Sequence, residues 1–226
     1  MLKNLLLTIL LFSGFNAFSQ AHFEGIVTYE MQLADRNSAD VSDETGGSDH
    51  LIPKEFKLYI NGNRTRLEIN AGQSVVTVIS SAADSTYTLM QIMGRKIALR
   101  TDTVQITAMQ DRLSGFRMVN LEGKRKILGY DCRKALMIHE ASGDSAEVWY
   151  TRELPPMKVA SGEFLPRMDD YFPMEVTSRK DGIELTMRLR EIQLVQVDKR
   201  FFELPSGYTI VDQDEIQKGL QLLSTP

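Results

Sequence analysis

The sequence predicts a mainly β protein, a curved antiparallel sheet or incomplete β-barrel with a few helices that include a short C-terminal one. Two observations point to this fold class, and a third concerns what stabilises it. Apolar and polar residues alternate with a period of two along most of the chain. Turn formers, among them Asn61 with Gly62 and Asp181 with Gly182, separate the short apolar runs. The single cysteine allows no intramolecular disulfide, so buried apolar area must stabilise the fold.

The first 19 residues are organised like a secretory signal peptide. Lys3 gives a basic start, residues 5–12 are apolar, and a small-residue site predicts cleavage between Ser19 and Gln20. The apolar stretch is shorter than the roughly 20 residues that span a bilayer, and no cysteine follows the cleavage point for lipidation. We therefore expect residues 20–226 to form one β-rich domain, periplasmic or secreted, without a membrane span.

The N-terminal half of this domain predicts a meander. Residues 22–33 form the first strand, with Gly25 marking a bulge. Residues 34–50 are rich in Asp, Ser and Gly and almost free of apolar side chains, which predicts a flexible acidic loop. From residue 54 to residue 99, short strands and tight turns alternate, and such neighbours usually pair. Residues 104–118 mix strand and helix patterns, and we expect some helix there.

The C-terminal half is arranged around a predicted β-hairpin. Its strands, residues 130–140 and 145–152, flank the turn Ala-Ser-Gly-Asp. Residues 123–126 (Gly-Lys-Arg-Lys) are expected in the turn before it, as a solvated basic edge rather than an anion site. Prolines interrupt residues 155–170, which predicts a surface connection or lid.

A second hairpin and a helix complete the predicted domain. Residues 173–179 and 183–197 form the hairpin, and in its second strand apolar residues from Ile183 onward alternate with charged ones. Asp212 is a suitable N-cap for the short C-terminal helix.

Composition limits the kinds of site. The formal net charge of −4 argues against nucleic acid as a partner. Cys132 and His139 are seven residues apart in one predicted strand, so they would lie on opposite faces, and the histidines have no metal-ligand spacing. We therefore expect no metal site, no cofactor and no catalytic residues, and do not expect an enzyme.

Four motifs together resemble a known family. They are F-x-G-x-V-x-Y at residues 23–29, K-I-L-G-Y-D-C at 126–132, V-W-Y-T at 148–151 and F-F-E-L-P-S-G-Y at 201–208. In this order they are similar to an exported family known as domain of unknown function 4412. A second exported family, named for a Gly-Leu-Pro-Gly-Leu-Ile motif, shares two of these pieces, but residues 164–168 read Phe-Leu-Pro-Arg-Met where its motif would lie.

The resemblance implies a fold and a type of ligand. The first family looks like a relative of the periplasmic lipoprotein carriers, whose incomplete barrel closes over an apolar cavity. This implies binding of acyl chains or another amphiphile.

Methionine supplies the candidate site. The chain has 11 methionines, whose flexible thioethers suit either a cavity for variable apolar shapes or ordinary core filling. Adjacent Trp149 and Tyr150 point to opposite faces of one strand, so one belongs to the core and the other to a rim. The ligand-binding residues that we expect are Met90, Met137, Trp149, Tyr150, Met174 and Met187.

Two functions remain open at this point. The leading hypothesis is an exported non-catalytic protein that binds a lipid, a lipoprotein acyl chain or another apolar ligand in a concave cavity. The alternative is a structural or protein-interaction module of the cell envelope, with a filled core and another envelope protein as its partner.

Overall fold

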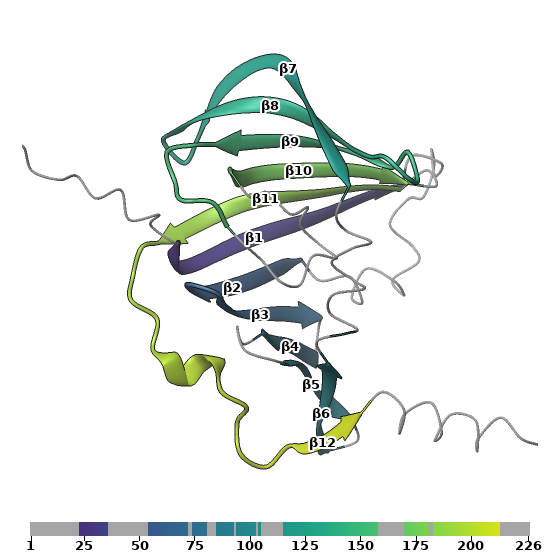
Figure 1. Ribbon diagram of the computed structural model, residues 1–226, viewed down its shortest axis with the longest axis vertical. Coiled ribbons are helices and arrows are strands. Elements are labelled where there is room, and N and C mark those ends of the chain that lie inside the picture. Colours follow the sequence, from purple (N-terminus) through teal and green to yellow (C-terminus); the bar gives the residue numbers. More distant parts are fainter. Residues whose placement is uncertain are drawn as a thin grey trace, which may run out of the picture.

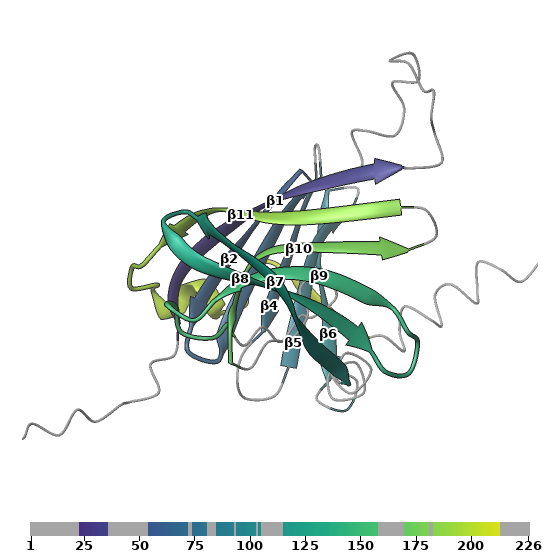
Figure 2. The ribbon, with the colours of Figure 1, turned by 90° about the horizontal axis from the view of Figure 1, so that it is seen from above.

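The computed structural model describes residues 23–35, 54–71, 74–80, 85–92, 94–102, 104, 115–157, 170–180 and 183–212. Twelve strands in these residues form one sheet, in the order β12-β6-β5-β4-β3-β2-β1-β11-β10-β9-β8-β7. The sheet curves and twists strongly, so that the directions of β10 and β11 cross those of β2 to β6 (Figures 1 and 2). Because β12 and β7 remain at separate edges, the sheet is open, and the predicted mainly β class is confirmed.

The first half of the sheet is a meander in which each strand pairs antiparallel with the next. These strands are β1 (Glu24–Asp35), β2 (Glu55–Asn61), β3 (Arg64–Ala71), β4 (Ser74–Ser80), β5 (Ser85–Ile92) and β6 (Arg95–Asp102). The alternation of apolar and polar residues predicts this arrangement correctly, including the tight turn after Asn61.

The second half adds strands on the other side of β1. They are β7 (Phe116–Ile127), β8 (Tyr130–His139), β9 (Ser145–Thr151), β10 (Phe172–Lys180) and β11 (Ile183–Gln193). A 3-10 turn, η2 (Lys199–Phe202), and β12 (Thr209–Asp212), which pairs parallel with β6, follow. The two predicted hairpins, β8–β9 and β10–β11, are confirmed.

The helix expected within residues 104–118 is borne out at Val104, which is helical, but two other details of the segment before β8 differ from expectation. Residues 116–118 begin β7 and are not helical, because Phe116 and Met118 pair across the sheet with β8. The basic residues 124–126 lie inside β7, because the turn to β8 is made by Leu128 and Gly129, which both have positive φ. Such a two-residue turn matches the twist of a hairpin.

Several predicted segments lie outside the described residues. They are the signal peptide, residues 36–50 of the acidic loop, residues 105–114, residues 158–169 of the proline-rich connection, and the C-terminal helix after Asp212. Residues 34 and 35, which we expect in the loop, extend β1 instead. No helix in the described ranges is long and apolar enough to cross a membrane.

The two faces of the sheet differ in character. We call the inner face the side that carries Tyr29, Phe56, Val148 and Met187, which the strand register places on one side. The main hydrophobic core lies on this face and extends from β8 to β3. A second, smaller core lies on the outer face of β4 to β6, where the segment containing Phe202 covers it.

Tyr29 joins the two halves of the sheet. Its ring stacks on Phe56 of β2 with centroids 5.0 Å apart, and its hydroxyl donates to the carbonyl oxygen of Pro173 in β10 at 2.6 Å. Pro173 adjoins the bulge of β10, where the ladder to β9 shifts register. Burial raises the pKa of the Tyr29 phenol far above its ordinary value, so this side chain remains a neutral donor.

Replacing Tyr29 with phenylalanine removes a hydrogen-bond donor from the carbonyl oxygen of the buried Pro173. We expect Tyr29→Phe to lower the free energy of unfolding by about 1–3 kcal/mol, measured by urea denaturation. The control is Tyr87→Phe, since the described part of the chain holds no hydrogen-bond partner for the partly buried Tyr87. Equal losses in the two variants would contradict the assigned role of the Tyr29 hydroxyl.

Candidate functional site

The structure brings four of the six expected ligand-binding residues together. Met137 of β8, Tyr150 of β9, Met174 of β10 and Met187 of β11 belong to the main core, and each is 3% exposed or less. Met90 is partly buried on β5, five strands from β11 in the sheet order.

Two further methionines belong with this group. Met31 lies directly opposite Met187 across β1 and β11, and Met118 lies directly opposite Met137 across β7 and β8. The alternation of β1 could have identified Met31, which shares a face with Tyr29. Met118 was missed because its segment is expected to be helical. The inner face therefore carries two cross-strand thioether pairs.

Trp149 and Tyr150 point to opposite faces of β9, as expected for adjacent residues of a strand. The structure shows which of the two lies on the inner face. Tyr150 is buried on the inner face, and its ring contacts Tyr171 with centroids 4.6 Å apart. Trp149 lies on the outer face, directly opposite Lys134, and the guanidinium carbon of Arg125 sits 4.1 Å from the centre of its ring. Trp149 is thus separated from the methionines by the thickness of the sheet.

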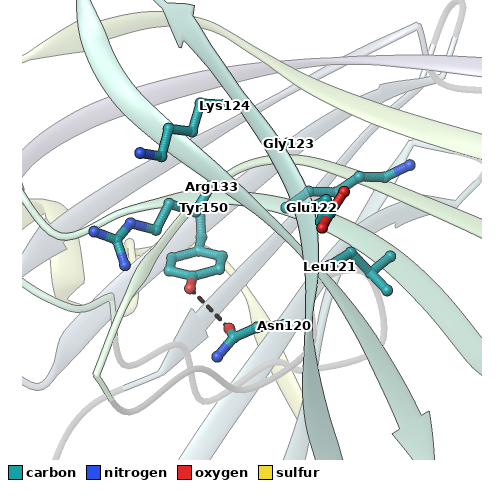
Figure 3. Close-up of a pocket in the computed structure, with 8 residues that line it drawn as sticks. Asn120, Leu121, Glu122, Gly123, Lys124, Arg133 and Tyr150 are labelled. Carbon is teal, nitrogen blue, oxygen red and sulfur yellow. Dashed lines mark hydrogen bonds between the residues drawn. The ribbon is translucent and has the colours of Figure 1, made fainter.

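An open hollow lies at the β7–β8 hairpin. We call it the hairpin hollow; its volume is about 490 Å³, and Figure 3 shows its lining. The lining residues are Asn120, Leu121, Glu122, Gly123, Lys124, Arg133, Lys134 and Tyr150. Lys124 and Arg133 extend to the same side of the hairpin, beside the Tyr150 ring (Figure 3). Its lining therefore carries three positive side chains, Lys124, Arg133 and Lys134, and one negative side chain, Glu122.

A bulge in β7 shapes this hollow. Leu121 pairs with Lys134, but the next residue to pair is Lys124, which leaves Glu122 and Gly123 without partners in the ladder. Gly123 has φ +145°, and a Cβ atom there would lie 3.1 Å from the Trp149 indole. Only glycine allows the backbone to approach the indole this closely, so Trp149 and Gly123 together place the bulge.

Tyr150 closes the base of the hairpin hollow. Its hydroxyl donates to the Oδ1 atom of Asn120 at 3.1 Å, as the dashed line in Figure 3 marks. Because the carbonyl oxygen of the Asn120 amide is used in this way, its NH2 group is left to donate elsewhere.

An ion-pair network covers the outer face beside Trp149. Glu175, 7% exposed, accepts from Arg188 at 2.6 Å and pairs with Arg125 at 2.7 Å. Burial alone would raise the pKa of Glu175, but the hydrogen bonds from Arg188 and Arg125 outweigh it and lower that pKa. A neighbouring group, Glu147, pairs with Lys134 and Arg179, and their hydrogen bonds lower the pKa of Glu147 as well.

Cys132 has the properties of a buried thiol. It is 2% exposed, its Sγ lies 3.4 Å from the Tyr130 carbonyl oxygen, and burial raises its pKa. A high pKa leaves little thiolate, which is the reactive form. Among the described residues, no group of three or more His, Cys, Asp or Glu side chains could hold a metal ion.

Comparisons with known proteins give a family and weak structural likenesses. A family model described as a domain of unknown function, DUF4412, matches residues 48–161. No curated protein matches the sequence. The structure of PNGF-II aligns at 13% identity and a TM-score of 0.45, over 88% of this chain and 33% of that one. The chain thus spans about a third of the length of PNGF-II.

Two structures of similar size also align. The lipoprotein LppX of Mycobacterium tuberculosis aligns at 12% identity and a TM-score of 0.39, over 77% of this chain and 90% of LppX. A LolA superfamily protein from Nitrosomonas europaea aligns at 11% identity and a TM-score of 0.37, over 83% and 92% of the two chains. All three TM-scores are below 0.5, so the family is assigned from the sequence match.

An alanine at position 123 would push against the indole and force a positive φ on a residue with a side chain. We expect Gly123→Ala to destabilise the protein by about 1–3 kcal/mol and to shift the fluorescence of Trp149, the only tryptophan. The control is Gly143→Ala, since Gly143 also has positive φ but no atom would lie within 4 Å of its Cβ. An unchanged emission spectrum in Gly123→Ala would contradict the packing of the bulge on Trp149.

The Glu175 network should contribute stability that depends on pH. Because the folded pKa of Glu175 is lowered, this stability is present above its ordinary pKa of about 4.5 and is lost as pH falls through the folded value. We expect Glu175→Gln to cost about 1–3 kcal/mol at pH 7 and less at pH 3, measured by urea denaturation. Exposed Glu140→Gln is the control, with an expected change below about 0.5 kcal/mol at pH 7. A loss for Glu175→Gln that is independent of pH would refute this account.

Proposed function

Since the chain belongs to the DUF4412 family, which its motifs resemble, we propose a function from its own geometry: it is a non-catalytic protein that binds a lipid, an acyl chain or another apolar ligand. The ligand would lie on the inner face of the open sheet. The observation that carries this proposal is the two methionine pairs, Met31 opposite Met187 and Met118 opposite Met137, within a continuous apolar face.

Methionine suits an apolar face that must adapt. The side chain is unbranched and polarizable, so it can leave one set of contacts and form another with little penalty. Small residues lie beside the thioethers, because Ala146 is directly opposite Met137 and Ala135 is on the same face of β8. An apolar chain could therefore replace contacts between side chains along β8 and β9 without exposing polar groups.

The chemistry of the described residues favours binding over reaction. The only thiol is buried, and the ion pairs around Glu175 and Glu147 hold strands together on the outer face. Export is included in this proposal because of the signal-peptide organisation of residues 1–19.

One observation favours the alternative function. Met137, Met174 and Met187 are almost fully buried, so the inner face is covered in this state. In the alternative, the protein is a structural or interaction module of the cell envelope whose core stays filled and whose partner is another envelope protein.

Native mass spectrometry on protein purified from its own host separates the two functions. We expect an added mass in the range of a lipid, which denaturation releases. A clean mass of the protein alone, together with one specific co-isolated protein, would favour the alternative.

Methyl NMR locates the ligand. With 13C-labelled methionine methyl groups and an added decyl-chain amphiphile, we expect the signals of Met31, Met118, Met137 and Met187 to shift. Met90 lies on β5, four or more strands away from each of these residues in the sheet order, so it is the internal control and should not shift. Signals would be assigned by single Met→Leu substitutions, which change volume little. Shifts confined to Met90, or none at all, would contradict binding on the inner face.

A further inference from the structure

Lys124 and Arg133 form a like-charged pair in the hairpin. They lie directly opposite each other across β7 and β8, where like charges destabilise a sheet. In a ladder without the bulge, the register of Leu121 with Lys134 would continue by placing Glu122 opposite Arg133. Because of the bulge, Lys124 and not Glu122 lies opposite Arg133.

The three nearest cations of the hairpin, Arg125, Lys126 and Lys134, are neutralised. Lys126 pairs with Asp131 at 3.1 Å, Arg125 with Glu175 and Lys134 with Glu147. Within the part of the chain that the structure describes, neither Lys124 nor Arg133 has an ion-pair partner. Glu122 is the one carboxylate that lines the hairpin hollow, and it pairs with neither of the two. The hollow therefore holds two positive charges that a bound anion would neutralise.

These charges share a face with the apolar site. Arg133 lies directly opposite Tyr150, and alternate residues of β8, Arg133, Ala135 and Met137, point to the inner face. Four residues of strand separate Arg133 from Met137 by roughly 13 Å. If an acidic headgroup bound between Lys124 and Arg133, an apolar chain attached to it could therefore lie along β8 and reach Met137.

We propose that the hairpin hollow is an anion site for the phosphate or carboxylate headgroup of an amphiphile whose apolar chain lies on the inner face. This inference rests on the proposed function. Lys124 and Arg133 supply the charge, and the NH2 group of Asn120 supplies a further donor beside them. The ligand class narrows from any apolar molecule to an acidic amphiphile.

Calorimetric titration of the full chain with three probes tests the site. The probes are monodecyl phosphate, 1-decanol with the same chain, and inorganic phosphate, each below the concentration at which it aggregates. We expect monodecyl phosphate to bind at least about tenfold more tightly than 1-decanol, because two charge-assisted contacts are gained. This advantage should shrink as salt is added.

The double variant Lys124→Gln with Arg133→Gln should bind both decyl probes equally and keep the affinity for 1-decanol. Both residues are exposed, and loss of the repulsion should leave the melting temperature equal or higher. The matched control is Arg117→Gln with Lys199→Gln, which removes the same charge from exposed positions, one of them on the outer side of β7. The control should retain the tenfold advantage.

The outcomes separate the two proposals. Equal binding of the decyl probes to the natural protein, or an advantage that survives in the Lys124 and Arg133 variant, overturns the anion site and leaves the proposed function standing. Phosphate binding that depends on the pair, without binding of either decyl probe, overturns the proposed function and supports an anion site alone. Binding of none of the three probes overturns both.

Discussion

The pairing of β1 with β11 is the constraint on which the rest of the structure depends. β1 pairs with β2 on one side and with β11, which lies close to the other end of the chain, on the other. Without this central strand, the N-terminal meander and the C-terminal hairpins would be two smaller sheets, each with one more exposed edge. The same junction holds Tyr29, whose ring and hydroxyl tie β2 and β10 to it.

Curvature follows from irregularities close to this junction. The ladder between β1 and β11 shifts register after Thr28, and that between β9 and β10 shifts after Pro173. Each bulge bends its strand and increases the local twist. The backbones also meet closely at Gly25, where a Cβ atom would lie 2.4 Å from the carbonyl oxygen of Gln193. The bent sheet can therefore bury a wide inner face around one continuous core.

Much of this fold could be predicted from local sequence signals, because hairpin turns and alternation depend on neighbouring residues. The hairpins β8–β9 and β10–β11 belong to this class, and so does the meander from β2 to β6. The strand β7 could not, since its methionine and phenylalanine fit a helical stripe equally well until pairing with β8 selects the strand. The apolar outer face of β4 to β6 depends on Val197 and Phe202, which arrive from a distant segment.

In the candidate site, too, some features follow from neighbouring residues in the sequence and others depend on pairing between distant strands. Burial of the methionines follows from alternation along each strand, but their pairing depends on the register between β1 and β11 and between β7 and β8. Met31 meets Met187 only because residues from opposite ends of the chain are neighbours in the sheet. Patterns within single strands contain no information on which strands are neighbours. This explains why Met90 and Met187 could be grouped by sequence although four strands lie between β5 and β11.

The bulge of β7 couples the two faces of the sheet. On the outer face, Trp149 lies against Gly123 and is held by Arg125 and Lys134. On the inner face, the two residues that the bulge adds replace Glu122 by Lys124 opposite Arg133. Because the bulge adds two residues, the side chains of β7 that follow it keep their faces. An insertion of one residue would turn each of them to the other face. The packing of Trp149 against Gly123, Arg125 and Lys134 on the outer face thus accompanies the bulge that places Lys124 opposite Arg133 on the inner face. In this way a packing contact on one face of the sheet is linked to the positive charge of the hairpin hollow on the other.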